Sequence, residues 1–202
     1  MFKLKIKYTE PDSLINSDFN NKLYENNIDE QLIINDIKVD ECIFKKIDFE
    51  NIVFESVEFI DVLFEDCTMT NKDFSKLLFR RCIFKNCKLL GSTFYDSDIN
   101  GMSIENSNAN YCNFSGSKIT DFYINDSKFN ESSFVECEFN KVTFNNVDFK
   151  NSEFLNTKLS GINFSSCNIN NCSFSMNNIK GMIIDRLQSE NIVELLGIKF
   201  DN

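Results

Sequence analysis

Phenylalanine recurs at every fifth position in the stretch Phe129-Asn-Glu-Ser-Ser-Phe134-Val-Glu-Cys-Glu-Phe139-Asn-Lys-Val-Thr-Phe144-Asn-Asn-Val-Asp-Phe149-Lys-Asn-Ser-Glu-Phe154. Continued in both directions, steps of five give 31 positions from Ile34 to Ile184, all apolar and 18 of them Phe. The phase never slips, so this segment contains no insertion or deletion. A period of five fits neither the 3.6 residues of a helix turn nor the alternation of a simple strand.

A second series lies two residues before each of these positions and is mostly small or medium in size, as at Cys82, Ser92 and Val142. The other three residues of each five are mostly Asn, Asp, Glu, Lys and Ser. This pattern fits a chain that turns a corner every five residues, so that four sides close a square coil. Residues 20 apart would then stack at the β spacing of about 4.8 Å, with the large residue of each side filling the centre.

Stacking by steps of 20 predicts continuous columns. One central column contains only phenylalanine and is the predicted structural core: Phe54, Phe74, Phe94, Phe114, Phe134, Phe154 and Phe174. Two surface columns alternate in sign, which favours the correct register of the coils: Lys45, Glu65, Lys85 and Glu105, and Asp98, Lys118, Glu138 and Lys158. Five of the six glycines fall two residues after a central position, where a corner needs a positive φ.

The unit small–x–Phe/Leu–x–x, as in Cys82-Ile-Phe84-Lys-Asn86, resembles that of the pentapeptide-repeat proteins. The resemblance covers about three quarters of the chain. It implies an all-β solenoid, the right-handed quadrilateral β-helix, over residues 34–184, with 31 repeats in about eight coils. The handedness is implied by the resemblance alone.

The two ends depart from the repeat. Residues 1–33 are interpreted as an N-terminal cap that begins with a strand at Phe2–Tyr8. In residues 185–202, Asp185 and Gln188 are placed for a capping box. A helix is predicted from about Arg186 to Leu196, and Gly197 ends it. Ile198 and Phe200 then alternate with Lys199, which predicts a short strand at Ile198–Phe200. The all-β solenoid is thus expected to carry one short C-terminal α-helix.

This tail resembles the ending of pentapeptide-repeat proteins related to the quinolone-resistance proteins. In those relatives the C-terminal module pairs two rods tail to tail, which implies a homodimer here. The dimerisation candidates are Leu187, Ile192, Leu195, Leu196, Ile198 and Phe200. The alternative is a helix that simply plugs its own last coil.

Catalysis is not expected. The chain has no histidine, which excludes Ser-His-Asp and Cys-His mechanisms and any zinc site that uses histidine. The eight cysteines share the small inward position of the repeat, where a thiol acts as a small apolar group. They are interpreted as structural. A solenoid without gaps offers no cleft for general acid–base chemistry, and no catalytic residue, metal ligand or cofactor is assigned.

The formal net charge of -10 argues against direct binding of nucleic acid and of anionic membranes. The N-terminus lacks the apolar stretch of a signal peptide and the chain has no membrane-spanning run, so a cytoplasmic location is expected. The acids cluster in the early part of the repeat. They are the partner-surface candidates: Asp48, Glu50, Glu55, Glu58, Asp61, Glu65 and Asp66.

The resemblance to the Qnr-like members without inserted loops implies a DNA-mimicking rod. Such a rod would bind DNA gyrase or topoisomerase IV and protect them against quinolones. The alternative is a structural or adaptor protein with another protein partner and no topoisomerase activity. A continuous acidic stripe would favour the mimic, and a surface of mixed sign with an apolar stripe would favour the adaptor. Candidates for an apolar stripe are Ile43, Leu63, Ile83 and Tyr123, which share one column.

Overall fold

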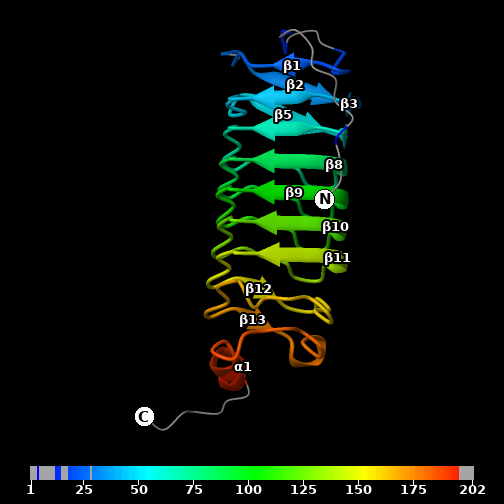
Figure 1. Ribbon diagram of the computed structural model, residues 1–202. Coiled ribbons are helices and arrows are strands. Elements are labelled where there is room, and N and C mark those ends of the chain that lie inside the picture. The colour runs from blue at the N-terminus through cyan, green and yellow to red at the C-terminus, as the bar shows by residue number, and fades with distance from the viewer. Residues whose placement is uncertain (1–3, 5–11, 15–17, 28, 196–202) are drawn as a thin grey trace.

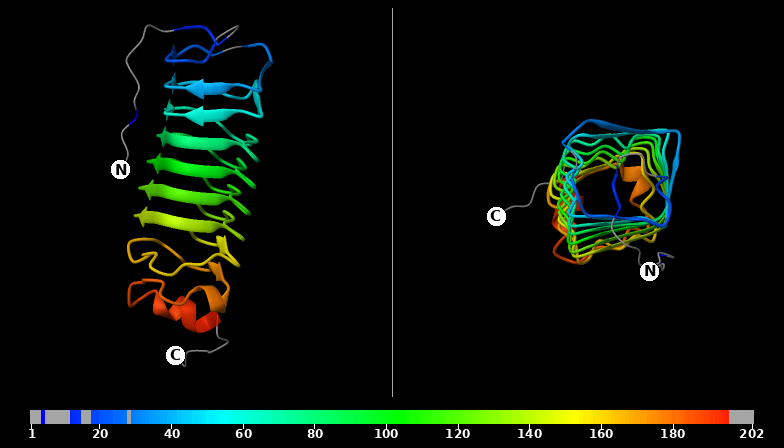
Figure 2. Two further views of the ribbon diagram at one scale, coloured as in Figure 1. Left: turned by 90° about the vertical axis from the view of Figure 1, so that its right-hand side faces the viewer. Right: turned by 90° about the horizontal axis from the view of Figure 1, so that it is seen from above.

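The computed structural model describes residues 4, 12–14, 18–27 and 29–195. The chain forms a rod whose coils stack along one axis, and the view from above shows a square cross-section (Figure 1, Figure 2). The coil is right-handed, since the strands at the front of Figure 1 run to the left as the chain descends toward its C-terminus. The strands are β1 (Leu23–Tyr24), β2 (Leu32–Asn35), β3 (Lys38–Asp40), β4 (Ile43–Lys45), β5 (Ile52–Glu55), β6 (Glu58–Ile60), β7 (Leu63–Glu65), β8 (Leu78–Lys85), β9 (Asp98–Glu105), β10 (Lys118–Asn125), β11 (Glu138–Asn145), β12 (Glu153–Phe154) and β13 (Ser173–Phe174).

The strands pair in parallel with strands of the neighbouring coils. Every pairing joins residues 20 apart, as in Phe79↔Ile99 and Phe154↔Phe174. The main sheet follows the order β1-β4-β7-β8-β9-β10-β11, with β3 and β6 joining it through β8. Two smaller sheets, β2-β5 and β12-β13, lie on another side of the rod. The period of five and the coil of 20 residues predicted from the sequence are therefore confirmed.

Four faces follow from these coils, and each is named by its central column. Face 1 is centred on the column of Phe44, face 2 on that of Phe49, face 3 on that of Phe54 and face 4 on that of Phe59. The central side chains point inward and nearly all are buried. The long strands β8 to β11 each bend around the corner between face 4 and face 1.

The predicted phenylalanine column is a continuous stack in the centre of the rod. Phe94 and Phe114 lie 4.6 Å apart between ring centroids and are tilted by only 6°, and Phe114 and Phe134 lie 5.1 Å apart with 8° between them. Rings from other faces meet this column edge-on, as Phe164 meets Phe154 at 82°. Both geometries are favourable for aromatic pairs, each worth about 0.5–1.5 kcal/mol beyond the area that it buries.

The corners use left-handed backbone, as the glycine pattern predicted. The five glycines at this phase have φ between 69° and 83°. Asn, Asp and other residues occupy the same position at most of the other corners, for example Asn86 with φ 55°. Space also restricts one corner, because a Cβ on Gly101 would lie 3.2 Å from the backbone nitrogen of Arg81 in the coil above.

The stacked coils begin upstream of Ile34. β1 pairs with β4, and Asn20 bridges Asp40. Leu14, Phe19 and Tyr24 have the same phase as the central residues and are buried with them. The count from Ile34 leaves these residues out, because Asp29 interrupts the apolar series. The strand predicted at Phe2–Tyr8 lies, apart from Leu4, outside the described residues.

The C-terminal end carries a 3₁₀ turn, Met176–Asn178, and the helix α1, Ser189–Leu195, which lies below the last coil (Figure 1). The helix begins at Ser189 and not near Arg186 as predicted, so the predicted contacts of Asp185 and Gln188 form in the turn that precedes it. The Leu187 N–H donates to the carboxylate of Asp185 at 2.7 Å, and the Asp185 N–H donates to the side-chain oxygen of Gln188 at 2.7 Å. No helix of the described part is long and apolar enough to cross a membrane.

Candidate protein-binding surface

The acids predicted to form a partner surface do not lie on one face. Residues 48 to 66 span almost one full coil, so these side chains form a belt around the rod. Asp48 and Glu50 lie on face 2, Glu55 on face 3, Glu58 on face 4, and Glu65 with Asp66 on face 1 and its corner. A cluster in the sequence becomes a patch in this fold only if its members recur every 20 residues.

Asp61 is not available to a partner, because its side chain is only 3% exposed. Its carboxylate accepts hydrogen bonds from Arg81 in the next coil, 2.7 Å from Nε and 2.5 Å from Nη2. This bidentate geometry is the strong form of the ion pair. The hydrogen bond to Asp61 raises the pKa of Arg81, so the guanidinium stays charged.

The basic run that follows the acidic belt neutralises much of it. Lys85 Nζ lies 2.8 Å from the carboxylate of Glu65, as predicted for their column, and Lys45 continues the column upward with Glu25 at 3.9 Å. In the second predicted column, Asp98 pairs sideways with Arg80 at 2.9 Å. Asp66 accepts a hydrogen bond from Asn86 at 3.0 Å. Ion pairs therefore gather on faces 4 and 1 and at the corner between them.

Face 3 carries most of the net negative charge of the repeat, with six carboxylates and two lysines. Its outward carboxylates are Asp36, Glu55, Asp73, Asp96, Glu136 and Glu153, and all six are exposed. None of them forms an ion pair within the described part of the chain. Face 3 has two lysines, but Lys72 turns its ammonium onto the backbone carbonyls of Glu50 and Ile52 at 2.8 and 3.1 Å. Desolvation lowers the pKa of Lys72. Lys76 is the second lysine of this face, and it forms no ion pair within the described residues.

The cysteines are buried and free, as the repeat predicted. Most of the Cys, Ser and Thr side chains at this inward position donate to a backbone carbonyl 23 residues earlier. The Cys112 thiol donates to Leu89 at 3.0 Å, and the Ser97 hydroxyl donates to Phe74 at 2.9 Å. Burial raises the pKa of Cys112 to about 12, which keeps it a thiol at neutral pH and makes it a poor nucleophile. Among the described residues no group of His, Cys, Asp and Glu is placed to hold a metal ion.

The apolar stripe predicted on face 1 is half-buried. Ile43, Leu63 and Ile83 stack on adjacent coils, but the next residue of the column is Ser103, which is buried and donates to Glu105 at 2.7 Å. The stripe is therefore separated from Tyr123. Its side chains belong largely to the packing of the wall.

The C-terminal dimerisation candidates divide into three groups. Leu187 is 82% exposed, whereas Ile192 packs against the core and so helps to close the last coil. Gln188 also closes it, since its amide donates to the carbonyls of Phe164 and Cys167 at 3.0 and 2.6 Å. α1 ends at Leu195, whose side chain is not described. The candidates that lie outside the described residues are Leu196, Ile198 and Phe200.

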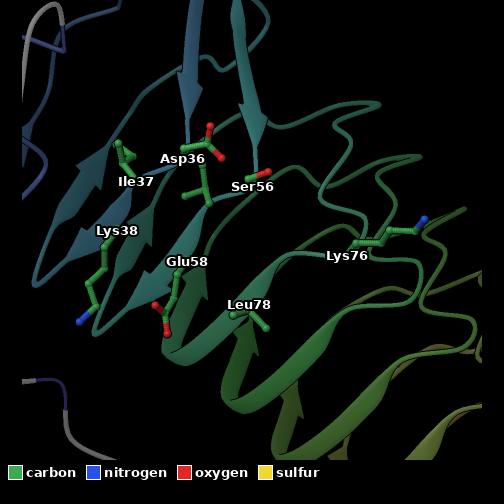
Figure 3. A pocket seen from close by; sticks show the side chains of 8 residues that line it. Asp36, Ile37, Lys38, Ser56, Glu58, Lys76 and Leu78 are labelled. Carbon is green, nitrogen blue, oxygen red and sulfur yellow. The ribbon is translucent and has the colours of Figure 1, made fainter.

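The rod has a hollow of about 510 Å³ at the corner between faces 3 and 4, which sequence reasoning did not find. It spans three coils, and Figure 3 shows the side chains that line it: Asp36, Ile37, Lys38, Ser56, Val57, Glu58, Lys76 and Leu78. A similar hollow of about 470 Å³ lies at the corner between faces 1 and 2, around Asp126, Asn146 and Asp148. Such hollows thus accompany more than one corner of the coil.

Comparison with known proteins identifies the repeat. Residues 77–148 match the family model described as pentapeptide repeat region. The sequence matches no curated protein at a significant level.

Solved structures similar to the chain include full-length QnrB1, a plasmid-mediated fluoroquinolone resistance protein. The two sequences are 19% identical, the match covers 87% of this chain and 100% of that chain, and the TM-score is 0.39. A trypsin-treated QnrB1 variant has 21% identity, coverage of 89% and 96%, and a TM-score of 0.40. HetL from the cyanobacterium Nostoc, a pentapeptide repeat protein involved in heterocyst differentiation regulation, has 6% identity, coverage of 82% and 85%, and a TM-score of 0.35.

Proposed function

Because this chain is a pentapeptide-repeat protein folded as a closed quadrilateral coil, we propose that it is a non-catalytic rod that binds another protein. The observation that carries this proposal is the uneven charge of the surface. Faces 4 and 1 and the corner between them hold the ion pairs of Arg80, Arg81, Lys85 and Lys141, whereas face 3 has six carboxylates and none of them forms an ion pair within the described residues. Unpaired carboxylates gathered on one face attract a basic protein surface and raise its rate of encounter.

The first partner class to test is DNA gyrase or topoisomerase IV, protected against quinolones by a rod that occupies the basic surface where DNA binds. The acidic net charge of -10 supports this candidate. So does the length of the repeat, roughly 37 Å for residues 34–184 at the β spacing. The binding would be to protein, without direct contact to nucleic acid, membrane or cofactor, and in the cytoplasm.

A second candidate is an adaptor for a different protein, and the surface columns favour it. The column at the edge of face 3 reads Asp36, Ser56, Lys76, Asp96, Gly116, Glu136 and Asn156, so its acids are interrupted. A close mimic of DNA would repeat its charge along the rod as regularly as phosphates do. The mixed columns suit a partner that reads a particular arrangement of charges.

Gyrase supercoiling and ciprofloxacin-stabilised cleavage distinguish the two candidates. We expect the purified chain, titrated from nanomolar to tens of micromolar, to inhibit supercoiling or to reduce drug-induced cleavage. The triple variant Glu55→Lys, Asp96→Lys, Glu136→Lys on face 3 should lose the effect. A matched triple variant on face 2, Glu50→Lys, Glu131→Lys, Asp148→Lys, should retain it. If the wild-type chain has no effect at any concentration, the topoisomerase proposal is wrong and the adaptor's partner is to be sought by pull-down.

We also propose that two rods associate through their C-terminal ends. Three exposed apolar side chains lie near this end, Leu187 at 82%, Ile183 at 49% and Met176 at 41%. Light scattering on the full chain should give about twice the mass of one 23.5 kDa chain. Leu187→Glu should return it to a single chain, since a buried charge at the centre of an interface is strongly unfavourable. A wild-type mass of 23.5 kDa would show that the helix acts only as a plug.

A further inference from the structure

The hollow between faces 3 and 4 contains an exposed leucine, which the hollow between faces 1 and 2 lacks. The surface column of face 4 that borders the hollow between faces 3 and 4 reads Lys38, Glu58, Leu78, Asp98, Lys118, Glu138 and Lys158. Leu78 is the one apolar residue in this row of charges. It is 38% exposed and lies at the open side of the hollow. A single exposed leucine is ordinary on a protein surface. Leu78 is of interest because it continues the apolar lining of this hollow.

The floor of the hollow is apolar as well. Val57 is buried beneath it, and Ile37 is half-buried and packs against the core. Together with Leu78 these side chains form an apolar lining on three successive coils. In the hollow between faces 1 and 2, the corresponding rim consists of Asp, Asn, Ser and Lys side chains. A volume of about 510 Å³ is large enough for one or two amino-acid side chains.

The charges around the hollow define what fits beside the apolar group. Lys38 is engaged with Asp40 at 3.6 Å, and the side chain of Lys76 extends away from Glu58 and Leu78 (Figure 3). Asp36 and Glu58 form no ion pair within the described residues. The available charge next to the apolar lining is therefore negative.

We propose that this hollow binds an apolar side chain of the protein partner, of leucine size, from a segment that places an Arg or Lys beside it. The apolar side chain contacts Leu78 and Val57, and the basic group faces Glu58 and Asp36. This inference deepens the proposed protein-binding function and rests on it only for the statement that the natural ligand is a protein.

The test uses the full chain with labelled methyl groups and two short probes. N-acetyl-leucyl-argininamide should cause saturable shifts in the methyl signals of Leu78, Val57 and Ile37 in NMR spectra. N-acetyl-leucyl-glutamic acid amide should bind at least about fivefold more weakly, because its charge has the wrong sign. N-acetyl-alanyl-argininamide should also bind weakly, because it lacks the apolar group.

Two variants isolate the contributions. Leu78→Lys restores the charged pattern of the column, so the fold should persist, and it should remove the shifts of Val57 and Ile37. Glu58→Gln should reduce the preference for the basic probe about two- to fivefold, as expected for an exposed charge pair. Tyr95→Lys is the matched control, since Tyr95 is an exposed apolar residue on face 3, at 47%, outside the hollow.

The proposal is overturned if no saturable shift occurs, if the acidic probe binds as well as the basic one, or if the folded Leu78→Lys variant still responds. These outcomes would leave the rod free to bind proteins elsewhere on its surface. Conversely, the hollow can bind the basic probe even if the chain has no effect on gyrase. The two proposals therefore fail separately.

Discussion

Phe114→Ala is expected to destabilise the rod by about 3–5 kcal/mol, the range for removing a fully buried aromatic side chain. Phe114 is completely buried and stacks on both sides, with centroid distances of 4.6 Å to Phe94 and 5.1 Å to Phe134. The substitution removes both stacking contacts and leaves a cavity in the centre of the coil. Chemical denaturation followed by far-UV circular dichroism measures the loss.

The size of the effect should depend on position in the stack. Phe174 ends the column, keeps one stacked neighbour, Phe154 at 5.6 Å, and is 6% exposed, so Phe174→Ala should cost less than Phe114→Ala. In a solenoid each coil contacts only its neighbours, so a weakened central coil also reduces cooperativity. We expect the Phe114→Ala transition to broaden. Equal losses at both positions would contradict the role assigned to the central stack.

Arg81→Ala is expected to cost about 2–3 kcal/mol, because it leaves the Asp61 carboxylate buried without its partner. The range lies below the 3–5 kcal/mol typical of fully buried pairs because the Arg81 side chain is 39% exposed, so that water can partly replace it. Asp61→Ala should cost less, since the freed guanidinium can turn into water. Denaturant midpoints of the two single variants and the double variant measure the coupling.

The same corner column contains a matched control. Lys141 and Asp121 occupy the positions of Arg81 and Asp61 three coils further along, but they are 3.8 Å apart and their side chains are 70% and 37% exposed. Lys141→Ala should therefore change the stability by less than about 0.5 kcal/mol, as is usual for exposed pairs. If Arg81→Ala is equally mild, the Asp61–Arg81 pair does not contribute through burial.

The core of this protein could be predicted from the sequence because one simple period encodes it. Each central residue has the same environment, so the period of five predicts the burial of Phe94 and of Phe154 in the same way. The cysteine slots and the glycine corners follow for the same reason. The rule ends where the period is interrupted. Asp29 hides the fact that Phe19 and Tyr24 belong to the stack.

The surface could be predicted much less well. Asp61 was assigned to the outside with its neighbours, but its burial depends on Arg81, which is distant in the sequence and adjacent in the coil. The acidic cluster became a belt because neighbours in the sequence lie on different faces. The hollow at Leu78 depends on side chains from three coils. When residues 20 apart are compared, Leu78 is the one apolar residue in a column of charged residues. The sequence alone therefore contained a sign of this hollow.

The register of 20 residues has a consequence for how such a chain can change its length. Deleting a single unit of five would keep every large residue in the centre but turn all later coils by a quarter. If the deleted unit lay between Glu65 and Arg81, Arg81 would no longer lie below Asp61, and Lys85 would lose Glu65. Deleting four units would instead shorten the rod by one coil and leave the columns of the remaining coils aligned. The core therefore tolerates deletions of any multiple of five residues, whereas the contacts between surface side chains are kept only by deletions of a multiple of 20 residues.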